Sequence, residues 1–139
     1  MTVQESVSVP GTVPGIRQAI AAFERFGGRH CLSARVRWRV AVGIDEILSN
    51  IVRYGGVQAA VILTFSLEQD GTVSVELVDD ATPFNPLLAP PPDRTSPLER
   101  RPAGTLGIAL VRMLMDDTAY ERRDGRNHFV MRCRAHAHR

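Results

Sequence analysis

The sequence predicts a single-domain α/β fold over residues 1–139, a two-layer sandwich with a mixed or antiparallel sheet covered on one face by about three helices. Segments with apolar residues at helical spacing are followed by segments with the two-residue period of strands. A length of 139 residues accommodates one core. The hydrophobic fraction of 44%, with 23% charged residues, is typical of a globular domain.

The first half of the chain is predicted to hold a strand and two helices. Residues 5–9 alternate like a short edge strand, and residues 15–26 form a helix that the glycines at 27 and 28 are expected to end. Ser33 is a candidate N-cap for a longer helix that reaches about Tyr54. Residues 1–8 and 135–139 are expected to be frayed.

The second half is predicted to contribute four strands and one helix. Residues 60–68 and 72–79 form a hairpin, and residues 118–122 and 127–134 form another that turns at Asp124 and Gly125. Seven of the nine prolines lie between Pro83 and Pro102, which indicates a functional loop or lid. A third helix is predicted from about residue 105 to residue 115.

Composition excludes several functions. All 17 basic residues are arginine, and the absence of lysine excludes a Walker-type P-loop, a Schiff-base enzyme and a kinase of the eukaryotic pattern. Arginines scattered among acidic residues, with only 6% aromatic residues, argue against nucleic-acid binding. No apolar run is long enough to cross a membrane. The first ten residues lack a secretory signal, so a cytoplasmic location is expected.

Glu46 and Asn50 are the first candidate site residues. A spacing of four residues on a helix makes a carboxylate and an amide oxygen project together, beside the predicted apolar stripe. Polar flanks of an ordinary amphipathic helix would give the same pattern.

Asp79 is the second candidate. It follows Val73, Val75 and Leu77 at the two-residue period, so its side chain should face the core, whereas Asp80 should face outward. A buried carboxylate needs a partner, and the exocyclic amine of adenine is one possibility. The alternative is an aspartate that caps the next turn.

A glycine-rich turn at residues 104–107 is the third candidate. It lies directly before the third predicted helix, where glycines let the backbone approach an anion such as a phosphate. A tightly packed helix entry is the alternative.

These three signals occur in the order and spacing of one known family. From about residue 15 to residue 134 the chain resembles the GHKL (Bergerat-fold) ATPases, and among them the anti-sigma-factor serine kinases of bacterial partner-switching systems. Glu46 and Asn50 match that family's N-box. The run from Val78 to Pro86 is similar to its adenine-aspartate motif, with Ala81 where glycine is usual. The turn at 104–107 matches the one that follows the ATP lid.

The resemblance implies a role for each residue. Asp79 would hold the adenine amine, Asn50 would bind Mg²⁺, and Glu46 would act as general base on a substrate serine. Ala81 would lie near the base and weaken ATP binding if its backbone needed a positive φ. The phosphates would be held by the backbone of the turn and by a lid arginine that offsets the γ-phosphate charge. The residues implied in phosphate binding are Arg100, Arg101, Gly104, Thr105, Leu106 and Gly107.

The implied function is an ATP-dependent anti-sigma factor that sequesters a sigma factor and phosphorylates a serine on its STAS-type antagonist. A homodimer is expected, without direct contact to nucleic acid or membrane. One alternative is a non-catalytic module that keeps a nucleotide as a structural ligand and captures a partner. A small DNA-binding regulator is the third possibility.

Overall fold

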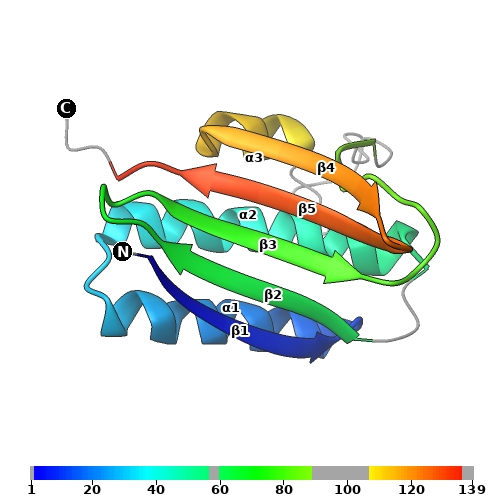
Figure 1. Cartoon of the computed structure of the whole chain (residues 1–139), viewed down its shortest axis with the longest axis horizontal. Coiled ribbons are helices and arrows are strands. Elements are labelled where there is room, and N and C mark those ends of the chain that lie inside the picture. The colour runs from blue at the N-terminus through cyan, green and yellow to red at the C-terminus, as the bar shows by residue number, and fades with distance from the viewer. Residues whose placement is uncertain (1, 57–59, 89–106, 136–139) are drawn as a thin grey trace, which may run out of the picture.

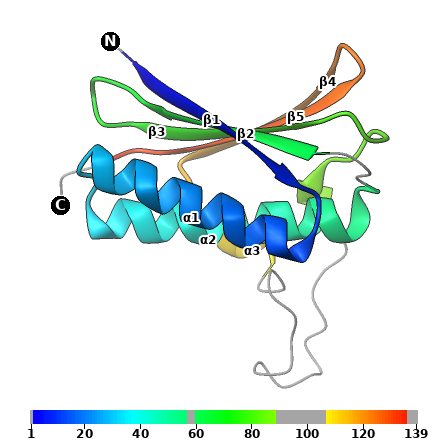
Figure 2. The same ribbon diagram turned by 90° about the horizontal axis from the view of Figure 1, so that it is seen from below.

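The architecture is an antiparallel sheet covered by helices on one face. The computed structural model describes residues 2–56, 60–88 and 107–135. Five strands are arranged in the order β1-β2-β3-β5-β4, and every neighbouring pair is antiparallel. Figures 1 and 2 show α1, α2 and α3 on one side of the sheet, with the other side open. The predicted two-layer sandwich is confirmed, and its sheet is antiparallel rather than mixed.

Strand β1 (Val3–Pro10) forms one edge of the sheet. It pairs with β2 (Ala60–Leu67) along its whole length, from Val3 opposite Leu67 to Pro10 opposite Ala60. The expectation that residues 1–8 are frayed is therefore wrong for residues 3–8, because the ladder with β2 satisfies their backbone groups. Residues 136–139 lie outside the described part of the chain.

Helix α1 (Val13–Arg29) begins at its N-cap Thr12, whose hydroxyl accepts a hydrogen bond from the Gly15 N–H at 3.1 Å. The prediction that Gly27 and Gly28 end this helix is wrong. A Cβ at Gly27 would lie 3.1 Å from the Arg37 side chain, so this glycine lets α1 pack closely against the next helix. Glycine lowers helix stability by only about 1 kcal/mol, which packing readily offsets.

Helix α2 (Ala34–Tyr54) runs beneath the sheet as predicted. The Ser33 hydroxyl accepts a hydrogen bond from the Val36 N–H at 3.2 Å, and Gly55 follows as the C-cap. Six apolar residues that recur at helical spacing along this helix form the predicted stripe, and all are buried: Val36, Val40, Ile44, Ile47, Leu48 and Ile51. This stripe fixes the rotation of the helix and thereby the direction of its polar residues.

The remaining elements complete the sheet and its cover. They are β3 (Val73–Asp79), the short 3₁₀ helix η1 (Pro86–Leu88), α3 (Ile108–Leu114), β4 (Asp117–Arg123) and β5 (Arg126–Cys133). The β4–β5 hairpin turns at Asp124 and Gly125, which have φ of 55° and 74° and fit the two-residue turn predicted there. Helix α3 is shorter than predicted at its end, and residues 105 and 106 lie outside the described part.

The core lies between the sheet and the helices. The rings of Phe23 and Phe26 on α1 meet Phe65 on β2, with centroids 5.4 and 5.6 Å from it. Strands β3 and β5 direct Val75, Leu77 and other apolar side chains to the same face. Among the described residues, no helix is both long and apolar enough to cross a membrane.

Candidate functional site

The polar pair on α2 is buried. Glu46 is 1% exposed and Asn50 is 6% exposed. The Asn50 Nδ2 donates a hydrogen bond to the backbone carbonyl of Pro86 at 3.2 Å, and the Glu46 Oε1 accepts one from the Gly107 N–H at 3.1 Å. A solvated helix flank is therefore excluded for both residues, and each of them meets one end of the segment between Pro86 and Gly107.

Asp79 lies at the carboxyl end of β3 and faces the helices. It is 5% exposed, while Asp80 is exposed, as the two-residue period predicts. Its Oδ1 accepts hydrogen bonds from the Ala81 N–H at 3.0 Å and from the Asn127 Nδ2 at 2.9 Å. No donor to its Oδ2 is found in the part of the chain that the structure describes. One carboxylate oxygen thus caps the following turn, and the other accepts no hydrogen bond from the described residues.

Asn127 is a site residue that the sequence reasoning missed. It is 4% exposed, on β5, directly opposite Asp79 in the strand register. Besides Asp79, its amide contacts the Thr82 carbonyl, the Phe84 N–H and the Tyr120 hydroxyl. The signal was present, because Asn127 shares the inward two-residue period of Phe129, Met131 and Cys133 and is the polar member of that series.

Ala81 is accommodated without backbone strain. Among the described non-glycine residues only Cys31 and Asp124 have a positive φ, so the condition under which Ala81 would disturb this turn is not met. The Ala81 carbonyl accepts a hydrogen bond from the Arg122 guanidinium at 2.7 Å. A methyl group at this position is thus compatible with the turn after Asp79.

Gly107 is the residue of the expected phosphate-binding group that lies within the described part of the chain. Gly107 precedes α3 with φ of 102°, a conformation in which glycine avoids the strain of a side chain. The rest of that group lies outside the described residues: Arg100, Arg101, Gly104, Thr105 and Leu106.

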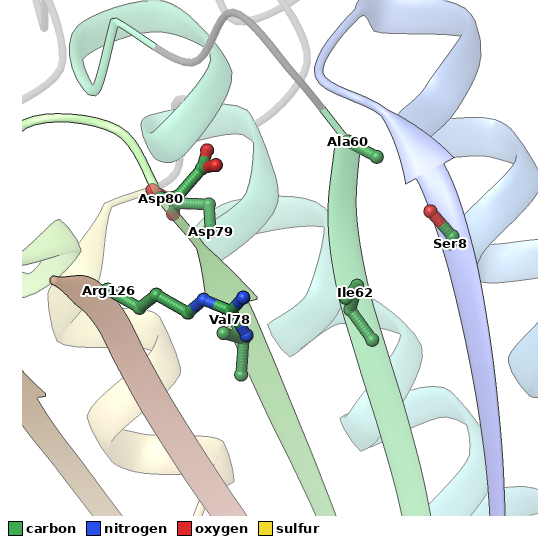
Figure 3. Close-up of a pocket in the computed structure, with 7 residues that line it drawn as sticks. All are labelled: Ser8, Ala60, Ile62, Val78, Asp79, Asp80 and Arg126. Atoms are coloured by element: carbon green, nitrogen blue, oxygen red, sulfur yellow. The ribbon is translucent and has the colours of Figure 1, made fainter. Parts of the chain in front are cut away.

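A hollow of about 210 Å³ lies on the open face of the sheet (Figure 3). Its lining residues come from β1, β2, β3 and β5, together with the residue that follows β3: Ser8, Ala60, Ile62, Val78, Asp79, Asp80 and Arg126. Ile62 and Val78 alternate with buried residues of β2 and β3, so this hollow lies on the opposite face from Glu46 and Asn50. It is therefore separate from the polar pair on α2.

The comparisons with known proteins agree with this geometry. The chain matches the histidine kinase-like ATPase domain over residues 9–133. The chain belongs to this family. The match includes all of the buried polar side chains described above.

The chain is also similar to one named kinase and to one solved structure. The chain is 29% identical over 130 residues to the serine/threonine-protein kinase BtrW of Bordetella bronchiseptica, and the alignment covers 91% of each protein. It also resembles a crystal structure of the RsbU and RsbW domains of a Mycobacterium tuberculosis protein, with a TM-score of 0.68 and 14% identity. That match covers 95% of this chain and 32% of the other, and shows the shared fold.

Membership of an ATPase-domain family implies ATP binding, and the residues present fit an adenine nucleotide. The Asp79 Oδ2 is an acceptor to which no described residue donates, and adenine presents an exocyclic amine donor. Because the Asn50 Nδ2 is committed to Pro86, its Oδ1 is the atom able to bind a cation. No group of three or more His, Cys, Asp or Glu among the described residues is placed to hold a metal.

Proposed function

We propose that the protein is an ATP-dependent serine kinase and anti-sigma factor, which sequesters a sigma factor and phosphorylates a serine on a STAS-type antagonist. The observation that carries the catalytic part is the buried pair on α2, in which Glu46 and Asn50 lie one helical turn apart. Similarity to a relative named as a serine/threonine-protein kinase supports it.

In this proposal, different residues of the chain bind the base, hold the metal and accept the proton. Asp79 orients the adenine through its Oδ2, and the Asn50 Oδ1 would hold Mg²⁺, which neutralises charge on the phosphate oxygens. The substrate serine oxygen forms a bond to the γ-phosphorus while the bond to the bridging β–γ oxygen breaks and ADP leaves. Glu46 takes the proton of the serine hydroxyl as general base. Arg100 or Arg101, with the backbone of residues 104–107, is proposed to stabilise the phosphate charge.

The partners and setting follow from the same proposal. The proposed partners are a sigma factor and a STAS-domain antagonist, the protein acts as a homodimer, and it works in the cytoplasm. Similarity to a serine/threonine-protein kinase and the fold shared with a structure that contains an RsbW domain support the choice of partners.

A non-catalytic nucleotide-binding module is the second candidate. It is favoured by the environment of Glu46, which is 1% exposed and already accepts a hydrogen bond from Gly107. In that case the nucleotide acts as a structural ligand, and the protein works by capturing its partner.

Phosphate incorporation distinguishes the two candidates. The purified protein is incubated with γ-labelled ATP, Mg²⁺ and the STAS-domain proteins of the host, each paired with a variant whose target serine is alanine. The kinase proposal predicts label on the wild-type antagonist alone. If ATP binds and no antagonist is labelled, the binding module is the better description.

A further inference from the structure

The Asn127 side chain uses its full hydrogen-bonding capacity. Its Nδ2 donates to the Asp79 Oδ1 and to the Thr82 carbonyl, each at 2.9 Å. Its Oδ1 accepts from the Phe84 N–H at 3.1 Å and from the Tyr120 hydroxyl at 2.5 Å. An asparagine amide has two donors and two acceptor positions, so every one of these positions in Asn127 is used. A buried polar group satisfied in this way has one orientation.

The neighbours determine which way the amide points. A backbone N–H can only donate, so the atom facing Phe84 must be the oxygen. The Thr82 carbonyl can only accept, so the atom facing it must be the nitrogen. These two contacts present an N–H of Asn127 to Asp79, which also accepts from the Ala81 N–H.

We propose that Asn127 is a positioning residue that sets the choice of base through Asp79. By holding the Oδ1 of Asp79, Asn127 keeps the Oδ2 as an acceptor that matches the amine of adenine. Guanine carries a carbonyl oxygen at the corresponding ring position, which would face this acceptor without a proton between them. The inference rests on the adenine contact assigned to Asp79 in the proposed function.

The same amide joins base recognition to the turn that follows β3. Thr82 and Phe84 precede Pro86, the residue that contacts Asn50. A Cβ placed on Gly55 would come within 3.3 Å of the Phe84 ring, so Phe84 reaches the end of α2. Loss of the Asn127 amide should therefore weaken nucleotide binding as well as discrimination between bases.

Asn127→Asp tests the proposal because it changes the chemistry with little change in shape. A carboxylate here would lie 2.9 Å from the Asp79 carboxylate, a pair in which both groups cannot readily be ionised. The Asn127→Asp protein should bind ATP about 10- to 100-fold more weakly than wild type at pH 8. Part of that loss should be recovered at pH 5.5, where the pair can share a proton.

Two further variants separate positioning from packing. Tyr120→Phe removes a hydrogen bond to the other side of Asn127 and leaves the contact with Asp79, so its ATP affinity should stay within about threefold of wild type. Asn127→Ser is smaller but its hydroxyl can still donate, so it should keep a higher ratio of ATP to GTP affinity than Asn127→Asp at pH 8. If the Asn127→Asp protein does not fold, Asn127→Ser provides the test of the proposal instead.

Calorimetry with ATP and with GTP, at pH 8 and pH 5.5, gives the readout, with each value divided by that of wild type at the same pH. The proposal predicts a lower ratio of ATP to GTP affinity in Asn127→Asp. Wild-type affinities and ratio in that variant at both pH values would overturn it, as would an equal loss in Tyr120→Phe. ATP binding without phosphoryl transfer would refute only the kinase function, whereas no ATP binding by wild type would refute both.

Discussion

The Asn50 amide lies 3.2 Å from the carbonyl of Pro86, 36 residues later in the chain, and donates a hydrogen bond to it. This contact leaves the Asn50 Oδ1 directed away from Pro86. Four residues earlier on α2, Glu46 accepts a hydrogen bond from Gly107. One turn of α2 therefore contacts both ends of the proline-rich segment, and the residues assigned to the metal and to the proton are also the ones that hold those ends.

Replacing Asn50 should uncouple ATP binding from Mg²⁺. Asn50→Ala removes the proposed oxygen ligand, and we expect its ATP affinity in Mg²⁺ to fall at least about 10-fold, to a value that no longer depends on Mg²⁺. Asn50→Asp keeps oxygen ligands but loses the donor to Pro86, so it should retain a Mg²⁺ dependence. ATP titrations with Mg²⁺ and with EDTA measure both. Equal Mg²⁺ dependence in wild type and Asn50→Ala would remove Asn50 from the metal site.

Asp79→Asn should abolish most ATP binding while the fold is kept. The oxygen of the new amide must face the two donors, Ala81 N–H and Asn127 Nδ2, so its NH₂ takes the place of the Oδ2. A donor then meets the donor of adenine, and we expect a loss of about 10- to 100-fold. Asp80→Asn is the matched control, because Asp80 is exposed and should tolerate the change. If the control loses affinity and Asp79→Asn does not, the assignment belongs to Asp80.

Two glycines of α1 should respond in opposite directions to alanine. A Cβ at Gly15 would lie 1.9 Å from the Pro10 carbonyl oxygen, a backbone atom at the end of β1, so Gly15→Ala should destabilise the protein by about 1–3 kcal/mol or more. A Cβ at Gly28 would meet nothing within 4 Å, so Gly28→Ala should stabilise it by about 0.4–1 kcal/mol. Urea unfolding of both variants tests the pair, and a destabilised Gly28→Ala would contradict the open space at that position.

Local pattern was sufficient for most of the fold. The stripe on α2 and the alternation in β2 and β3 predicted the inward faces of these elements, including the burial of Asp79. The pattern failed at Gly27, because the reason for that glycine is Arg37 on the next helix. Contacts between distant segments are not encoded in the spacing of neighbouring residues.

For the candidate site too, residues on one helix could be predicted from the sequence, whereas a contact between distant strands could not. Glu46 and Asn50 lie on one helix, so their common direction could be predicted from their spacing. Asn127 is 48 residues from Asp79, and the two meet only because β3 and β5 pair in the observed register. That register is determined by the packed sheet, which is why the positioning residue was missed and its partner was found.

Asp45 should make stability depend on pH. Its burial raises the pKa of the Asp45 carboxyl above the ordinary value of 3.8, against the opposing effects of the Ser49 hydrogen bond and the Arg53 charge. A raised pKa means that the folded state disfavours the ionised form, so stability is lost as pH rises through the folded pKa. Asp45→Asn, which can still accept from Ser49, should therefore gain stability over wild type at pH 7 and gain less at pH 3.5. Thermal unfolding at both pH values measures this, and an equal difference at the two would exclude titration of Asp45.

Glu46→Gln distinguishes a catalytic role of Glu46, as general base, from a structural role as hydrogen-bond acceptor. The amide oxygen of glutamine can still accept the hydrogen bond from Gly107, so the packing of α3 against α2 should persist. A glutamine cannot take a proton from a serine hydroxyl, and we expect phosphoryl transfer to fall about 10²- to 10⁴-fold. ATP affinity should change by less than about threefold, because the proposed contact with adenine belongs to Asp79. Glu46→Ala, which loses both the base and the acceptor, should lose transfer to the same extent and also unfold at a lower temperature.

The measurements are single-turnover phosphate transfer, ATP affinity and thermal unfolding for each variant. Transfer at the wild-type rate in Glu46→Gln would show that Glu46 is not the general base.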